Sequence, residues 1–133
     1  MLTNKIDTNN DKATFECKRK IIVVTGIGSG MGRELVLELA KRGARVAAVD
    51  INKEAVLKTA RLAPESKEKI STRVANITER EAIEKLVDDV KEYHGTVDGI
   101  INNAGIIQPF IDVNDLGYDK IEQVMNVNLY GTL

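Results

Sequence analysis

The sequence has few of the residues that mark disulfide-stapled, metal-binding or aromatic-rich proteins. Of its 133 residues, none is tryptophan, 4% are aromatic, and cysteine and histidine each occur once. Because Cys17 has no partner in the chain, an internal disulfide is excluded and a reducing compartment is favoured. No group of Cys, His, Asp and Glu has the spacing of metal ligands, so we expect no metal site. Aliphatic residues must therefore fill the core.

The chain also has neither a large net charge nor a long apolar run. The net charge is −1, from 19 basic and 20 acidic residues, so we expect neither a nucleic-acid partner nor an anionic membrane partner. No apolar run approaches the ~20 residues that a membrane span needs. Residues 1–19 are expected to form a polar N-terminal tail, in which residues 1–16 contain no apolar core of a signal peptide. We therefore expect a cytoplasmic protein with one domain over residues 20–133.

A glycine-rich segment between an apolar run and an amphipathic run is the most informative feature of the chain. It reads Thr25-Gly26-Ile27-Gly28-Ser29-Gly30-Met31-Gly32 and follows the apolar residues 21–24. Glycine can turn with φ above zero, lets the main chain approach a pyrophosphate, and lets a helix start pack tightly on a strand. The helix N-terminus then offers unpaired N–H groups and a partial positive charge to phosphate oxygens. The segment therefore predicts a cradle for the phosphates of a nucleotide.

Apolar runs and helical patterns alternate along the rest of the chain. We expect strands over 20–25, 45–50, 70–75 and 97–102. Helices are expected over 30–42, from an Asn52 cap towards Pro64, from a capping box at Thr78 and Glu81 to Gly95, and from about Gly117 onwards. This order predicts an α/β fold, a doubly wound parallel sheet of which the first half is present, with strand order 3-2-1-4 and flanking helices. We interpret His94 as a cation at a helix C-terminus and not as a site residue.

Asp50 ends the second expected strand, about 20 residues past the glycines. A carboxylate at that position accepts hydrogen bonds from an adenosine ribose and would repel a 2′-phosphate. No Arg or Lys lies within residues 26–32, and Ile51 and Asn52 follow the aspartate. The pattern favours NAD over NADP. The alternative is that Asp50 is a helix N-cap or a solvated strand end.

Four short motifs stand in order over residues 20–133. Thr25 leads the spacing Gly26-x-x-x-Gly30-x-Gly32, and the later motifs are Asn76-Ile77-Thr78, Asn102-Asn103-Ala104-Gly105 and Asn128-Leu129-Tyr130-Gly131. Together they resemble the short-chain dehydrogenase/reductase family. The resemblance implies a Rossmann-like NAD-binding domain and hydride transfer between a nicotinamide cofactor and a small-molecule secondary alcohol or ketone. Family members often form dimers and tetramers, which implies a possible homo-oligomer.

The resemblance also implies a role for each matching position. The pyrophosphate would be lined by the glycines and by their close backbone neighbours, which are Gly26, Ile27, Ser29, Gly30, Met31 and Gly32. Asp50 would hold the ribose, Asn76 would contact the adenine amino group, and Ile77 would flank the ring. The cofactor groove would be edged by the residues after the fourth strand, Asn103, Ala104 and Gly105. Asn128 matches the family's catalytic asparagine, which supports a water that contacts the active-site lysine.

Three of these positions have simpler interpretations. Asn76 is also explained by an Asx turn before a helix. The pair Asn102 and Asn103 is also explained by turn chemistry, because asparagine tolerates the left-handed region. Asn128 shares a helical face with apolar residues, so it is also explained as a satisfied core amide that kinks its helix.

The family's chemistry needs a Tyr acid/base, a Lys four residues on and a Ser upstream. The tyrosines of this chain are Tyr93, Tyr118 and Tyr130, and none is followed four residues later by lysine. We therefore expect the N-terminal portion of a longer oxidoreductase, ending before the catalytic Ser and Tyr-x-x-x-Lys. The alternatives are a non-catalytic NAD-binding module and an inactive remnant.

Overall fold

A four-stranded parallel sheet forms the centre of the molecule. The computed structural model describes residues 16–133, so the part of the expected tail over residues 1–15 lies outside the described residues. The strands are β1 (Ile21–Thr25), β2 (Arg45–Asp50), β3 (Ile70–Val74) and β4 (Gly99–Ile101). They lie in the order β3-β2-β1-β4 with all pairs parallel. The predicted fold class and strand order are confirmed.

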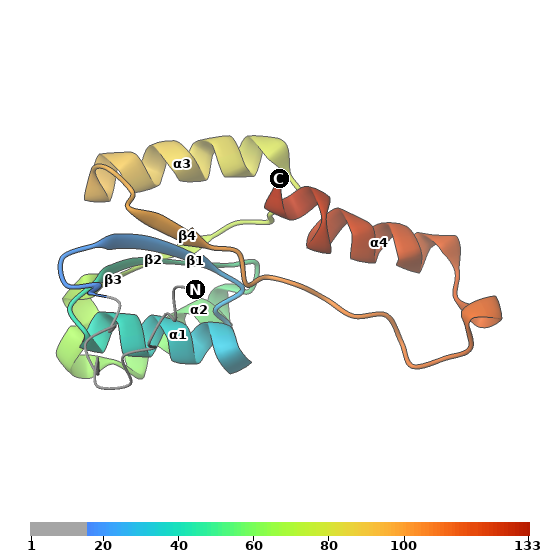
Figure 1. The fold of residues 1–133 in the computed structure, drawn as a ribbon, viewed down its shortest axis with the longest axis horizontal. Coiled ribbons are helices and arrows are strands. Elements are labelled where there is room, and N and C mark those ends of the chain that lie inside the picture. The colour runs from blue at the N-terminus through green and yellow to red at the C-terminus, as the bar shows by residue number, and fades with distance from the viewer. Residues whose placement is uncertain (1–15) are drawn as a thin grey trace, which may run out of the picture.

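Helices cover both faces of this sheet. Figure 1 shows α1 (Gly30–Lys41) and α2 (Lys53–Arg61) on one face and α3 (Arg80–His94) on the other. The last helix, α4 (Tyr118–Asn128), stands beside the sheet at the end of an extended connection (Figure 1). Short 3₁₀ helices, absent from the sequence-based expectation, are η1 (Pro64–Lys69), η2 (Val113–Asp115) and η3 (Tyr130–Thr132).

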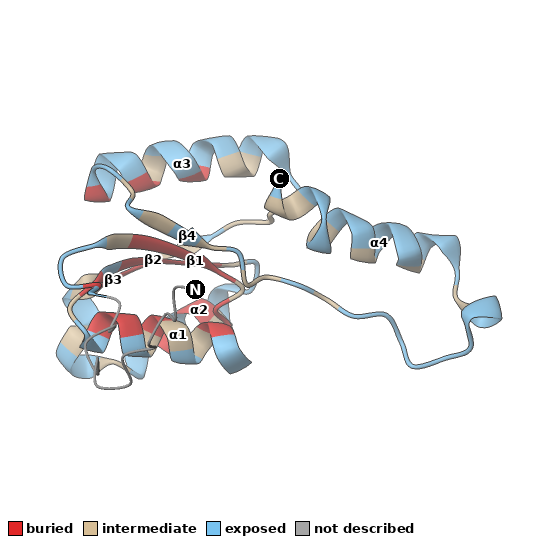
Figure 2. Cartoon of the chain, in the orientation of Figure 1, coloured by how far each residue is buried: buried red, intermediate tan, exposed pale blue. Residues whose placement is uncertain are grey.

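The inner strands are buried on both faces, as a parallel sheet between helix layers requires. Alternate side chains point to opposite faces, so Val24 and Val46 pack towards α1 and α2, while Val23 and Ala47 pack towards α3. Figure 2 shows the buried residues along β1, β2 and the sheet-facing sides of the helices. The carboxyl ends of all four strands therefore meet at one well-supported edge.

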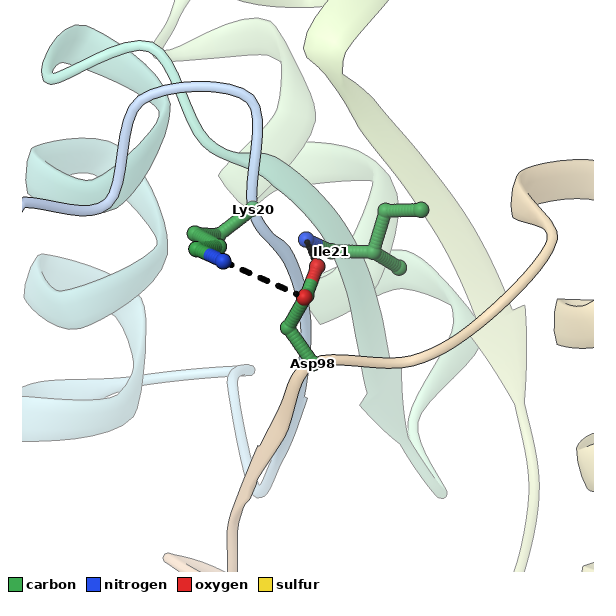
Figure 3. Close-up of polar contacts among 3 residues, drawn as sticks. All are labelled: Lys20, Ile21 and Asp98. Atoms are coloured by element: carbon green, nitrogen blue, oxygen red, sulfur yellow. Dashed lines mark hydrogen bonds and ion pairs between the residues drawn. The ribbon is translucent and has the colours of Figure 1, made fainter.

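The fourth strand is shorter than the expected range 97–102, and Asp98 lies directly before it. Its main-chain N–H donates to the Ile21 carbonyl at 2.8 Å, and its Oδ2 accepts from the Ile21 N–H at 2.8 Å. Lys20 Nζ lies 3.4 Å from the other carboxylate oxygen (Figure 3). The hydrogen bond from Ile21 and the Lys20 charge lower the pKa of Asp98. Asp98 thus joins the starts of β1 and β4, and strand pairing begins at Gly99.

Two sequence-based interpretations near α3 are wrong. The expected capping box fails because Glu79, not Thr78, occupies the N-cap, and the Thr78 hydroxyl donates to Asn76 Oδ1 at 2.8 Å. The interpretation of His94 as a cation at the helix C-terminus fails, because it is 7% exposed and its Nε2 lies 2.5 Å from Ser71 Oγ. Burial, with smaller effects of Arg45 and Arg73, lowers the pKa of His94 and favours the neutral ring.

The packed region begins before the first strand. Cys17 falls in the segment expected to be a tail, yet it is 2% exposed and belongs to the core on the α1 side of the sheet. The Arg19 N–H donates to the Gly43 carbonyl at 2.8 Å. Within residues 16–133 we find no helix both long and apolar enough to cross a membrane, and no group of His, Cys, Asp and Glu placed to hold a metal ion.

Candidate cofactor-binding site

A cavity of about 610 Å³ lies at the carboxyl edge of the sheet. It is bounded by the glycine turn, the residues that follow β2, β3 and β4, and one side of α4. The residues predicted from the sequence that line it are Gly26, Ser29, Gly30, Met31, Gly32, Asp50, Asn76, Ile77, Asn103, Ala104 and Gly105. The structure thus brings together nearly all positions that the sequence assigned to a cofactor.

Ile27 is the exception among the predicted cofactor neighbours. Its side chain is 0% exposed and packs in the core on the α1 and α2 side of the sheet, and it does not line the cavity. Its contribution is through the main chain, because its N–H donates to the Val49 carbonyl and its carbonyl accepts from Thr59 Oγ1. A direct contact between the Ile27 side chain and a ligand in the cavity is therefore excluded in this conformation.

The glycines of the turn are needed for different physical reasons. Gly26 and Gly30 adopt φ values of 71° and 53°, which side chains rarely accept. A Cβ on Gly26 would lie 2.6 Å from Ala104 Cα, and one on Gly32 would overlap the Gly26 carbonyl oxygen. By contrast, a Cβ on Gly30 would meet nothing within 4 Å. Two glycines close the turn against β4 and α1, while Gly30 leaves the space in front of the turn open, which fits a bound pyrophosphate.

Asp50 connects β2 to the glycine turn. Its Oδ2 accepts from the Gly28 N–H at 2.8 Å, and its Oδ1 accepts from the Asn52 N–H at 2.9 Å. The interpretation of Asp50 as a helix cap is wrong, because Asn52 caps α2 by accepting from the Ala55 N–H at 3.0 Å. The carboxylate is half-buried and lines the cavity. Each of its oxygens has two lone pairs, so capacity remains for hydroxyl donors.

Asn103 and Thr25 fasten the turn to the end of β4. Asn103 Nδ2 donates to the Thr25 carbonyl at 3.1 Å and to the Gly26 carbonyl at 3.0 Å. Thr25 Oγ1 accepts from the N–H groups of Asn103 and Ala104 at 3.2 and 3.1 Å. The left-handed turn considered for Asn102 and Asn103 is wrong, because Arg19 is the non-glycine residue with positive φ within residues 16–133.

Asn76 forms an Asx turn at the end of β3. Its Oδ1 accepts from the Thr78 N–H at 3.0 Å and from the Thr78 hydroxyl at 2.8 Å, and its Nδ2 donates to Glu79. The Asx-turn interpretation is confirmed. The predicted contact between this oxygen and an adenine amino group would replace one of these two bonds. Ile77 follows as an apolar wall of the same cavity.

Asn128 is the last residue of α4 and clamps the main chain that follows β4. Its Oδ1 accepts from the Ile106 N–H, and its Nδ2 donates to the Ile106 carbonyl, both at 2.8 Å. The side chain is satisfied, but Asn128 is exposed and ends its helix, so a kinked core amide is the wrong description. Through this clamp Asn128 fixes the far wall of the cavity.

Sequence reasoning missed several lining residues. Ile51 and Ala75 each directly follow a strand end, which is a signal that could have found them. Gln123 and Val127 line the cavity from α4. Their i, i+4 spacing places them on one helix face, but no sequence pattern shows which way the connection after β4 carries that face.

A glycine turn between a parallel strand and a helix, opening on a cavity at the carboxyl edge of the sheet, is the arrangement of dinucleotide-binding α/β proteins. Residues 20–133 match the family model described as short chain dehydrogenase. The chain belongs to the short chain dehydrogenase family.

Individual relatives agree with this family. The chain is 35% identical over 112 residues to the 3-oxoacyl-[acyl-carrier-protein] reductase FabG of Thermotoga maritima, covering 84% of this chain and 45% of that protein. It is 31% identical over 131 residues to levodione reductase of Leifsonia aquatica, covering 93% and 47%. An NAD⁺-bound xylitol dehydrogenase superposes with a TM-score of 0.82 at 32% identity, covering 87% and 45%. The chain spans less than half the length of each of these relatives.

Proposed function

We propose that this chain is the cofactor-binding portion of an NAD-dependent oxidoreductase acting on a secondary alcohol or ketone. The observation that carries the proposal is the Asp50 carboxylate, which lines the cavity while holding the glycine turn through Gly28. The similarity to an NAD⁺-bound xylitol dehydrogenase and to two reductases supports the same chemistry.

When bound, the nicotinamide cofactor supplies or accepts the hydride, and the residues of this chain hold it. The N-terminus of α1 would offer its unpaired N–H groups and partial positive charge to the pyrophosphate. Asp50 would accept hydrogen bonds from the hydroxyls of the adenosine ribose. Ile77 and Asn76 line the cavity, where Ile77 would pack against the adenine and Asn76 would contact its amino group.

Asp50 also sets the choice between the two nicotinamide cofactors. NADP places a phosphate where NAD places the 2′-hydroxyl, so the carboxylate would face a like charge at short range. The glycine turn from Gly26 to Gly32 contains no Arg or Lys to compensate that charge. The proposal is therefore NAD, with a preference of about tenfold or more, equivalent to about 1.4 kcal/mol.

Proton transfer to or from the substrate oxygen needs an acid/base that this site does not supply. Tyr93, Tyr118 and Tyr130 do not line the cavity. We propose that a Tyr, a Lys and a Ser outside these 133 residues complete the reaction, with Asn128 supporting their water. The same observation favours a second function, a module that binds NAD without turnover.

The experiment compares Kd values for NAD and NADP by calorimetry. Because Asp50 also accepts from the Gly28 N–H, its loss would loosen the turn and weaken the binding of both cofactors together. The readout is therefore the ratio of the two Kd values. Asp50→Ala is expected to bring the ratio close to one, and Asp50→Ala with Ile51→Arg is expected to favour NADP. Ile51→Arg alone is the matched control and should keep the preference for NAD. An unchanged ratio in Asp50→Ala would contradict the ribose assignment. Turnover by a longer form, and none by these 133 residues, would distinguish the enzyme from the binding module.

A further inference from the structure

Two consecutive carbonyls of the glycine turn are held from outside the cavity. The Ile27 carbonyl accepts from Thr59 Oγ1 at 2.9 Å, and the Gly28 carbonyl accepts from Arg33 Nη2. Thr59 lies on α2 and is 0% exposed, whereas Arg33 lies on α1 and is half-buried. Neither residue lines the cavity. Their hydrogen bonds act on the rear of the turn.

The Thr59 hydroxyl joins three segments. Besides the Ile27 carbonyl, it lies 3.1 Å from the Ala55 carbonyl within α2, and it accepts from Arg33 Nε at 3.0 Å. A hydroxyl has one proton and two lone pairs, so it can donate to a carbonyl while accepting from the guanidinium. Thr59 and Arg33 therefore form one connected unit between α1, α2 and the turn.

Because peptide groups are planar, the hydrogen bonds of Thr59 and Arg33 also orient N–H groups on the cavity side of the turn. In a trans peptide the carbonyl of one residue and the N–H of the next point in opposite directions. Holding the Ile27 carbonyl directs the Gly28 N–H the other way, where it donates to Asp50 Oδ2 at 2.8 Å. Holding the Gly28 carbonyl directs the N–H of Ser29 away from Arg33, and Ser29 lines the cavity.

We propose that Arg33 and Thr59 are positioning residues of the glycine turn. Thr59 directs the Gly28 N–H to Asp50, and Arg33 directs the Ser29 N–H towards the cavity and thereby sets the affinity for the cofactor's pyrophosphate. The inference rests on the proposed function. It predicts that loss of the Arg33 side chain weakens ligands that carry a pyrophosphate and leaves ligands without one nearly unaffected.

The first test measures Kd values for NAD, ADP and adenosine. Arg33→Met should raise the Kd for NAD and ADP roughly tenfold, as expected for a lost charge-assisted hydrogen bond, and change that for adenosine less than about twofold. Arg42→Met is the matched control, because Arg42 caps the other end of α1 and forms an exposed ion pair with Glu38. It should change none of the three Kd values. Equal weakening of ADP and adenosine, or no weakening of either, would overturn the proposal.

The second test uses Thr59 and needs no ligand. Thr59→Ser keeps the hydroxyl and should behave as the native protein, whereas Thr59→Val keeps the shape and removes the hydrogen bonds. In Thr59→Val, amide exchange at Gly28 should accelerate about tenfold more than at Val23, which reports opening of the core strand. Equal acceleration would overturn the positioning role. If the native chain binds neither NAD nor ADP, the proposed function fails, while the exchange result still decides the role of Thr59.

Discussion

The glycine turn and α4 face the same cavity, but they are held in place differently. The turn is bonded to β2 through Asp50, to β4 through Asn103, and to α1 and α2 through Arg33 and Thr59. α4 reaches the rest of the described residues through the Asn128 clamp on Ile106. The phosphate side of the cavity is thus part of the core, while the opposite wall is attached at one end.

Burial shows the same difference. The strand and helix that flank the turn contain fully buried residues such as Val24 and Val36, whereas α4 contains no buried residue. On α4, Ile121 is 39% exposed and Met125 is 43% exposed. Substitutions around the turn should therefore cost global stability, and those on α4 should not.

The largest effect is expected at Gly32. Gly32→Ala places a Cβ against the Gly26 carbonyl oxygen and the Asn103 side chain, which cannot move without breaking the turn. We expect a loss of about 3 kcal/mol in the free energy of unfolding, measured by urea titration, together with loss of NAD binding. Gly99→Ala is the control, because its Cβ would meet nothing within 4 Å. Equal stability of the two variants would show that the turn is not tightly packed.

Asn103 and Asn128 provide a direct comparison between the two walls. Asn103→Ala leaves the Thr25 and Gly26 carbonyls without their donor and should reduce the free energy of unfolding by about 2 kcal/mol. Asn128→Ala removes two exposed bonds and should cost less than about 1 kcal/mol, while exchange of the Ile106 amide becomes faster.

Asn102→Ala is the control for that pair, since Asn102 is the exposed neighbour of Asn103. It should change stability by less than about 0.5 kcal/mol. A cost for Asn128→Ala equal to that for Asn103→Ala would mean that α4 is as much a part of the cooperative core as the turn.

A pH dependence should act on the sheet and not on α4. His94 is the last residue of α3 and contacts Ser71 of β3, with Arg45, Arg73 and Tyr93 as its charged or titratable neighbours. Burial lowers its pKa in the folded protein, so the unfolded chain binds the proton more readily. The contribution of neutral His94 to the free energy of unfolding should be fully present above the ordinary pKa of 6.5. It should be lost as the pH drops below that value, by at most about 1.4 kcal/mol per pH unit.

Urea unfolding at pH 7.0 and 5.5 measures this slope. His94 is the only histidine, so His94→Phe should remove most of the slope in this range. Between these two pH values, the rate of amide exchange on α4 should change only by the intrinsic pH dependence of amide exchange. A slope that persists in His94→Phe would assign the dependence to other groups.

Much of the fold could be predicted because local patterns determine it. The apolar runs at residues 21–25 and 45–50 predicted strands buried on both faces, and the strand order was that of a doubly wound α/β domain. The turn and Asp50 were predicted because glycine spacing and a strand-end carboxylate are local features. The roles of the lining residues towards a cofactor stay predictions.

What could not be predicted depends on competition between nearby groups. Thr78 had the spacing of a capping residue, but its hydroxyl and N–H were both taken by Asn76. The position of His94 next to Gly95 predicted a cation at a helix end, but the path of α3 across the sheet brought it to Ser71. The contacts of Arg33 with Thr59 join residues 26 positions apart and leave no pattern in the sequence.

The buried thiol of Cys17 gives this molecule an internal probe of its own opening. As the only cysteine, at 2% exposure, it can react with a thiol reagent only when the chain ahead of β1 detaches from the core. The labelling rate at high reagent concentration therefore reports how often that edge of the structure opens, without a tag or a substitution. Slower labelling on addition of NAD would measure how far cofactor binding at one end of β1 stabilises the other.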